Sequence, residues 1–217
     1  QQLYNWVDAL IVGNFVGETS LAAVGAAGIV PGLFISVILG FCVGVSIVIS
    51  QAYGAGDQPT ISRVTGAFTA LLTLVSLALA ALGIALAGPL LRLLGTPGDI
   101  LDLSAQYLRI LFFGLPALSV YNVYGAALRG IGDSRTPLNA IALSSAANVL
   151  LDLLLVAVIP LGVQGAAIAT VLSQWVMSLY LLFHVPRRHP LLKYPVNRSL
   201  LDRHAIRRGL SLGLPTM

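Results

Sequence analysis

Charged residues are scarce in this sequence. Only 9% of its 217 residues are Asp, Glu, Lys or Arg, against roughly a quarter in ordinary soluble domains. Hydrophobic residues make up 57% of the chain, and the mean hydropathy is +0.91. This balance excludes an ordinary soluble domain and predicts a protein that crosses a membrane several times.

Cysteine is nearly absent as well. Cys42 has no second cysteine with which to form an internal disulfide or share a metal ion, so packing is its expected role. The sequence contains no HExxH or GxSxG motif, and no histidine lies near Cys42. His184, His189 and His204 are scattered without metal-ligand spacing. These absences argue against a membrane-embedded enzyme, which is the least favoured reading.

Apolar segments divide the chain into six expected membrane helices and the start of a seventh. The six are expected at residues 3–16, 21–53, 60–87, 103–128, 138–159 and 165–185, and the seventh opens at 209–217. Gly114 and Pro116 predict a bend in the fourth, and residues 88–95 predict a separate interfacial helix. The first segment is shorter than the ~20 residues that a span needs, so we expect residues to be missing before Gln1.

Basic residues predict the orientation of these spans. Ten of the twelve Lys and Arg fall in three segments that we place in the cytoplasm: Arg63; Arg129 and Arg135; and Arg187, Arg188, Lys193, Arg198, Arg203, Arg207 and Arg208. The net charge of +4 therefore reflects membrane orientation and not nucleic-acid binding. The expected organisation is a six-helix N-terminal lobe at residues 1–185, a basic cytoplasmic linker at 186–208, and the start of a seventh helix at 209–217.

Two carboxylates are expected inside the membrane. Six of the eight acidic residues fall in expected turns or loops, which leaves Asp8 on the first span and Asp152 on the fifth. Asn148 and Asp152 are four residues apart, so on a helix they share one face and place an amide oxygen beside a carboxylate. Intramembrane carboxylates usually mark an ion or substrate pathway. The alternative is that Asp152 only joins two helices through a buried hydrogen bond.

Other polar side chains fall on the expected spans. Tyr4 lies four residues before Asp8, Thr170 lies four before Gln174, and Asn122 lies near the cytoplasmic end of the fourth span. Each has a purely structural alternative: an interfacial aromatic belt for Tyr4, a bond to its own helix for Thr170, and helix packing for Asn122.

A buried cluster of this kind predicts ion coupling. Desolvation and mutual repulsion of two carboxylates favour proton capture, whereas the oxygens of Asp8, Asn148, Asp152 and Thr170 are also suitable Na⁺ ligands. Either ion removes negative charge, so a cationic substrate attracted by the carboxylates would be released when the ion binds. This hypothesis is wrong if efflux stays ion-coupled when Asp8 and Asp152 are both replaced by Asn.

Five short motifs resemble the multidrug and toxic compound extrusion (MATE) transporters. They are YNWVDALIVG at residues 4–13, LAAVG at 21–25, QAYGAGD at 51–57, RGIGDSRTP at 129–137 and NVLLD at 148–152. Each motif is weak alone, but together they span most of the chain in order. The resemblance implies a twelve-helix antiporter of two six-helix lobes, of which this chain is the N-terminal lobe plus the start of the seventh helix.

The resemblance also implies functions for individual residues. Asp8 matches the family's first-helix carboxylate, and Asn148 and Asp152 match its fifth-helix pair. Tyr4, Asn122 and Thr170 fall where the N-lobe polar cluster would continue. Such proteins export cationic or amphiphilic compounds against H⁺ or Na⁺ and use no other cofactor.

The form of the first motif implies a bacterial or archaeal plasma membrane. The main alternative is a lipid or lipid-linked oligosaccharide flippase of the same superfamily. A flippase would favour a basic cavity, because its substrates carry phosphates.

Overall fold

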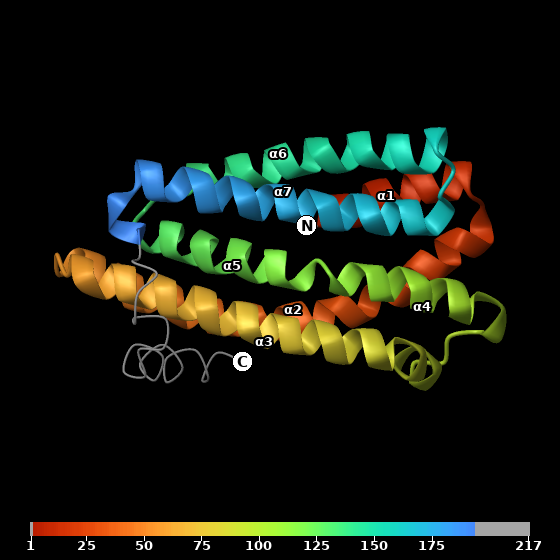
Figure 1. Ribbon diagram of the computed structural model, residues 1–217, viewed down its shortest axis with the longest axis horizontal. Helices are drawn as coiled ribbons and strands as arrows, with labels where there is room; N and C mark the ends of the chain where they lie inside the picture. The colour runs from red at the N-terminus through yellow and green to blue at the C-terminus, as the bar shows by residue number, and fades with distance from the viewer. Residues whose placement is uncertain (1, 194–217) are drawn as a thin grey trace. The chain divides into compact units, whose positions relative to one another are not determined.

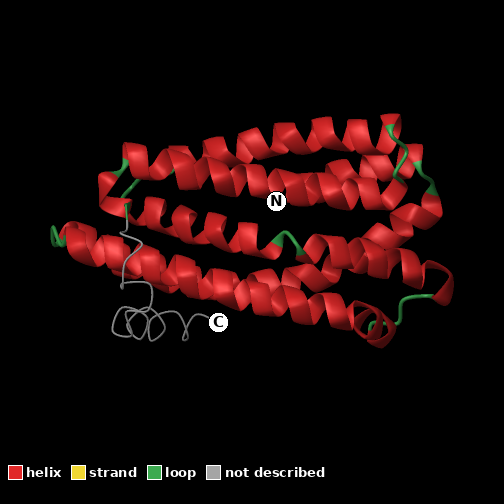
Figure 2. Ribbon diagram, viewed as in Figure 1, coloured by secondary structure: helices red, strands yellow, loops and turns green. Residues whose placement is uncertain are grey.

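The computed structural model describes the backbone of residues 2–193 and the side chains of residues 8–193. Within that range the chain is helical throughout, with short connecting loops and no strand (Figure 2). The α-helices, coloured in chain order in Figure 1, are α1 (Gln2–Phe15), α2 (Glu18–Gly54), α3 (Gln58–Leu93), α4 (Gly98–Phe112), α5 (Leu115–Gly130), α6 (Arg135–Asp152) and α7 (Gly162–Arg188). A π-helix (Leu153–Val158) continues α6, and a 3₁₀ turn (Pro190–Leu192) follows α7.

Four of the described helices are long and apolar enough to cross a membrane, and α4 with α5 make a fifth span if that bent pair is counted as one. The predicted bend is confirmed, because the helix breaks at Phe113 and Gly114. The separate interfacial helix at residues 88–95 was wrong, since α3 runs on through Pro89 to Leu93. A membrane helix can include proline when the freed carbonyl is satisfied in another way. Helix α1, at 14 residues, is too short to count as a span by length alone.

The described chain packs as two compact units. Unit 1 comprises the chain up to Phe34 together with Leu77–Leu115 and Ile141–Val176. Within it the ring of Phe34 meets the fully buried ring of Phe112 edge to face, with centroids 5.3 Å apart. Unit 2 comprises Ile35–Ser76, Pro116–Ala140 and the described residues from Met177 onward.

The two units differ in charge. Unit 2 carries six of the eight basic residues in the described chain: Arg63, Arg129, Arg135, Arg187, Arg188 and Lys193. Unit 1 carries five of the seven described acidic residues: Asp8, Glu18, Asp99, Asp102 and Asp152. This division follows the charge pattern from which the cytoplasmic segments were predicted.

Two turns in unit 2 are built in the same way. Gly56 and Gly132 both have positive φ, 72° and 85°, a conformation that glycine adopts without a steric cost. The residue after each is an aspartate that caps the next helix. Asp57 accepts hydrogen bonds from the backbone N–H and the hydroxyl of Thr60, and Asp133 accepts the same pair from Thr136. The repeated Gly-x-Gly-Asp motif is thus a repeated helix start.

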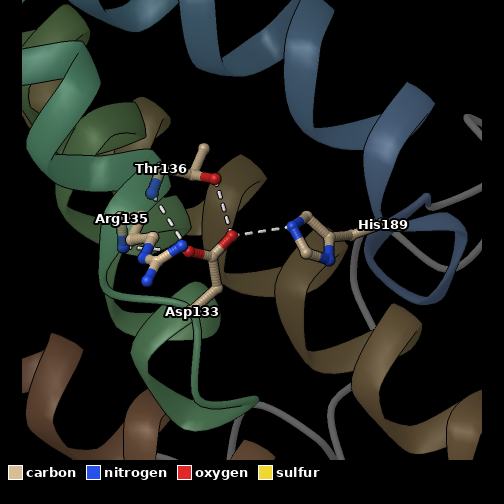
Figure 3. Close-up of polar contacts among 4 residues, drawn as sticks. All are labelled: Asp133, Arg135, Thr136 and His189. Atoms are coloured by element: carbon tan, nitrogen blue, oxygen red, sulfur yellow. Dashed lines mark hydrogen bonds and ion pairs between the residues drawn. The ribbon is translucent and has the colours of Figure 1, made fainter.

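Asp133 makes two further contacts (Figure 3). The backbone N–H of Arg135 donates to its Oδ1 at 2.9 Å, and Nε2 of His189 lies 2.8 Å from its Oδ2. Partial desolvation opposes ionisation, but the hydrogen bonds from Thr136, His189 and Arg135 outweigh it and lower the pKa of Asp133 to about 2. Asp133 is therefore an acceptor at neutral pH, so Nε2 of His189 carries the hydrogen.

Candidate functional site

Four of the predicted site residues converge in unit 1 from three helices. Asp8 comes from α1, Asn148 and Asp152 from α6, and Thr170 from α7. The side chains of Asp8, Asn148 and Asp152 are fully buried, and Thr170 is 6% exposed. Small residues on α7, including Ala166, Ala167 and Ala169, are buried beside Thr170 and let the helices approach closely.

One hydrogen bond ties α1 to α7 at this cluster. The hydroxyl of Thr170 donates to Oδ2 of Asp8 at 2.7 Å, and both groups are buried. Asp8 also interacts electrostatically with Asn148 and Asp152. The two carboxylates therefore share one polar site and do not point away from each other.

Most of the remaining polar atoms of the cluster lack hydrogen-bond partners among the described residues. They are Oδ1 of Asp8, both oxygens of Asp152, and both Oδ1 and Nδ2 of Asn148. A buried polar group without a partner is costly, by about 1–3 kcal/mol each. Because four of these five atoms are acceptor oxygens, a proton or a hard cation would satisfy them, as expected of Na⁺ ligands. The described residues form no cluster of three His, Cys, Asp or Glu side chains suited to a transition metal.

The backbone changes conformation directly after the second carboxylate. The α-helix ends at Asp152, and residues Leu153–Val158 form a π-helix, a rare form that is frequently found at functional sites. Helix α7 packs closely against this segment, because a Cβ at Gly165 would lie 2.8 Å from the carbonyl oxygen of Leu155. Gly165 therefore permits the close approach of α7 to the backbone that follows Asp152.

Two other predicted residues are not placed in this cluster. Asn122 belongs to unit 2, and its Nδ2 donates to the carbonyl of Leu118 on its own helix at 2.8 Å. The backbone of Tyr4 lies in α1, but its side chain is outside the described residues. Most of the expected basic linker and all of the expected seventh helix, residues 194–217, also lie outside the range that the structure describes.

Tyr107 is a further candidate site residue, which the sequence analysis did not identify. Its ring on α4 is 3% exposed, and its phenol lies within electrostatic range of both Asp8 and Asp152. The only signal in the sequence was its spacing of three from Ser104, which places two polar groups on one face of α4. The hydroxyl of Ser104 donates to the carbonyl of Ala23. No feature of the sequence predicted that the face of α4 carrying Tyr107 lies near Asp8 on α1.

The cluster, the π-helix and the repeated turns occur in a chain that matches known transporters. A protein-family model described as MatE matches residues 1–154. The chain belongs to the MatE family. MATE proteins are transporters, so the chain is not expected to be an enzyme, and the membrane-embedded enzyme alternative is set aside.

Individual relatives agree with this assignment. The probable multidrug resistance protein YpnP of Bacillus subtilis is 36% identical over 91% of this chain and 44% of its own length. A protein of Shewanella oneidensis named FAD transporter is 34% identical over 76% of this chain and 37% of its own length. A crystal structure of a MATE protein in the bent conformation covers all of this chain and 48% of that protein, with 30% identity and a TM-score of 0.91.

The MATE chain described here therefore spans about half the length of the relatives that it matches. Its described part is an all-α bundle that matches half of the MATE fold, with four or five helices able to span a membrane. The chain is thus a multi-pass membrane protein of the MATE family.

Proposed function

We propose that the full-length protein is a secondary antiporter that exports cationic or amphiphilic compounds in exchange for H⁺ or Na⁺. In this proposal the chain forms the N-terminal six-helix lobe, with α4 and α5 together making one bent span, and the protein lies in a bacterial or archaeal plasma membrane. The observation that carries the proposal is the burial of Asp8 and Asp152 with Asn148 in one site, where four acceptor oxygens have no hydrogen-bond partner among the described residues.

The coupling follows from charge. With both carboxylates ionised, the site attracts a cation, since charges interact strongly in a low-dielectric interior. A proton on one carboxylate, or a Na⁺ held by Asp8, Asp152, Asn148 and Thr170, reduces the negative charge that attracts the substrate. The coupling ion and the cationic substrate therefore compete for the negative charge of the two carboxylates. The hydroxyl of Thr170 supports Asp8 in its ionised form, and we assign the phenol of Tyr107 a supporting position beside both carboxylates.

The test is efflux from vesicles that hold the full-length protein, with tetraphenylphosphonium as substrate and with proton and Na⁺ gradients imposed separately. Asp8→Asn combined with Asp152→Asn is expected to abolish ion-driven efflux. Asp99→Asn, an acid in the exposed first turn of α4, is the control and is expected to retain it. Ion-driven efflux that survives in the double variant would contradict the proposal.

Two alternative substrates can be tested in the same vesicles. The relative named FAD transporter makes an anionic nucleotide one candidate, and a phosphate-bearing lipid, as a flippase would carry, is another. Two buried carboxylates repel phosphate, so the site favours a cation. Transport of FAD or of a labelled anionic lipid, without transport of tetraphenylphosphonium, would favour these alternatives.

A further inference from the structure

One turn of α7, residues 170–174, is hydrogen-bonded to two other helices of unit 1. Thr170 donates to Asp8 on α1, and the carbonyl of Ser173 accepts a hydrogen bond from Ser144 on α6. Gln174 lies four residues after Thr170, so both side chains project from one face of α7. A displacement of Gln174 would therefore be transmitted along this turn to Thr170 and the carboxylate site.

Gln174 contacts the break at the end of α4. A Cβ built at Gly114 would overlap the amide oxygen of Gln174, so this oxygen occupies the space that a side chain at position 114 would need. The next residue, Trp175, donates its indole N–H to the carbonyl of Phe113 at 3.3 Å. Gln174 and Trp175, two consecutive residues of α7, therefore contact Gly114 and Phe113, the two residues between α4 and α5.

The position of this amide is not explained by its own hydrogen bonding. Gln174 is 9% exposed, and its Oε1 has no hydrogen-bond partner among the described residues. A buried amide oxygen without a partner is destabilising, and a leucine or methionine would fill the same volume without that cost. Its placement against Gly114 is therefore compatible with a function that outweighs its cost in stability.

We propose that Gln174 is a positioning residue for ion exchange at Asp8, because its amide, packed over Gly114, sets where Thr170 lies relative to that carboxylate. This inference rests on the proposed antiport. It adds a residue that touches neither carboxylate, and it predicts that a change at Gly114 alters ion binding through Gln174.

The test is a double-mutant cycle in the full-length protein with Gly114→Ala, Gln174→Ala and the two combined. The readout is the concentration of Na⁺, or of H⁺, that gives half-maximal efflux of tetraphenylphosphonium. Gly114→Ala alone displaces the amide and is expected to shift that concentration by about tenfold, a size typical of residues in direct contact. Gln174→Ala is expected to shift it severalfold. In the Gln174→Ala background, Gly114→Ala is expected to add nothing, since the overlap has been removed.

A second glycine provides a matched control. A Cβ at Gly83 would overlap the ring of Phe112, an apolar contact in the same unit. Gly83→Ala is expected to lower thermal stability, and Phe112→Leu is expected to relieve that effect. Neither should change the half-maximal ion concentration, because this contact has no polar link to Asp8.

Two outcomes would overturn the inference. One is an equal shift by Gly114→Ala with and without Gln174, and another is an unchanged half-maximal ion concentration in Gln174→Ala. An unchanged half-maximal ion concentration in Gln174→Ala overturns the inference even if Gly114→Ala does not fold. If the parent shows no ion-driven efflux, the proposed function fails. The positioning of Asp8 is then measured separately, by the effect of Na⁺ and pH on the thermal unfolding of purified parent and Gln174→Ala.

Discussion

Replacing Thr170 with valine isolates one hydrogen bond of the carboxylate site. Valine keeps the branched shape of threonine and removes only the hydroxyl that donates to Oδ2 of Asp8 at 2.7 Å. Oδ1 of Asp8 has no partner among the described residues, so the variant leaves that carboxylate without this donor and without a replacement. The change is therefore aimed at the charge of Asp8 and leaves packing nearly intact.

The expected magnitude follows from the type of bond. A hydrogen bond to a charged group contributes about 1.5–3 kcal/mol, and each 1.4 kcal/mol corresponds to a factor of about ten in affinity. Thr170→Val also removes the hydroxyl oxygen proposed as a Na⁺ ligand, so it is expected to weaken Na⁺ binding by about tenfold to a hundredfold. If the coupling ion is H⁺, the half-maximal pH is expected to rise by about one to two units, because the lost hydroxyl supported the ionised form of Asp8.

The assay is the ion dependence of tetraphenylphosphonium efflux by the full-length protein, and Thr69→Val is the matched control. Thr69 is also 6% exposed, but its hydroxyl donates to the carbonyl of Thr65 on its own helix. The control is expected to keep the parental ion dependence. An ion dependence for Thr170→Val within twofold of that of Thr69→Val would refute the reasoning that Thr170 supports the charged form of Asp8.

Further predictions concern the turns and the π-helix. Asp133→Ala should lower the free energy of unfolding by about 1 kcal/mol, as loss of a helix cap does, and Asp57→Ala should act similarly through Thr60. The pKa of Asp133 is lowered in the folded state to about 2, so its stabilising effect is present above its unfolded pKa of about 4. Thermal unfolding should show this effect lost as pH falls from about 4 to 2, and an unchanged pH profile in Asp133→Ala would contradict it. Gly165→Ala should destabilise by about 1–3 kcal/mol because the new methyl group meets the carbonyl of Leu155, whereas Gly28→Ala, in open space on α2, should be neutral or slightly stabilising. Equal effects of Gly165→Ala and Gly28→Ala on the unfolding temperature would contradict the expectation that the backbone at Leu155 resists the new methyl group.

Local chain chemistry made several features of the fold predictable. The bend near Gly114 and Pro116 follows from a residue without a side chain two positions before one without an N–H. The repeated Gly-x-Gly-Asp turns follow from positive φ at glycine and from capping by aspartate. The end of α3 was predicted wrongly, because Gly88 and Pro89 carry the same local signal as a helix break, yet α3 continues through them.

The site was predictable only in part. Asp8, Asn148 and Asp152 stood out because a carboxylate or an amide is costly in an apolar span. Tyr107 did not stand out, since a tyrosine in a membrane helix has several ordinary explanations. The π-helix after Asp152 was not predictable, since the segment Leu153–Val158 is wholly apolar and carries no local signal.

The sequence by itself determined that this protein lies in a membrane, where most of its helices lie, and which polar residues are buried at a cost. These properties depend on composition and on spacing along one helix. Only the tertiary structure decided that Thr170 bonds Asp8, that Tyr107 lies near both carboxylates, and that Gln174 fills the space above Gly114. Those contacts join residues up to 162 positions apart in the chain, and the packing of one helix face on another brings them together.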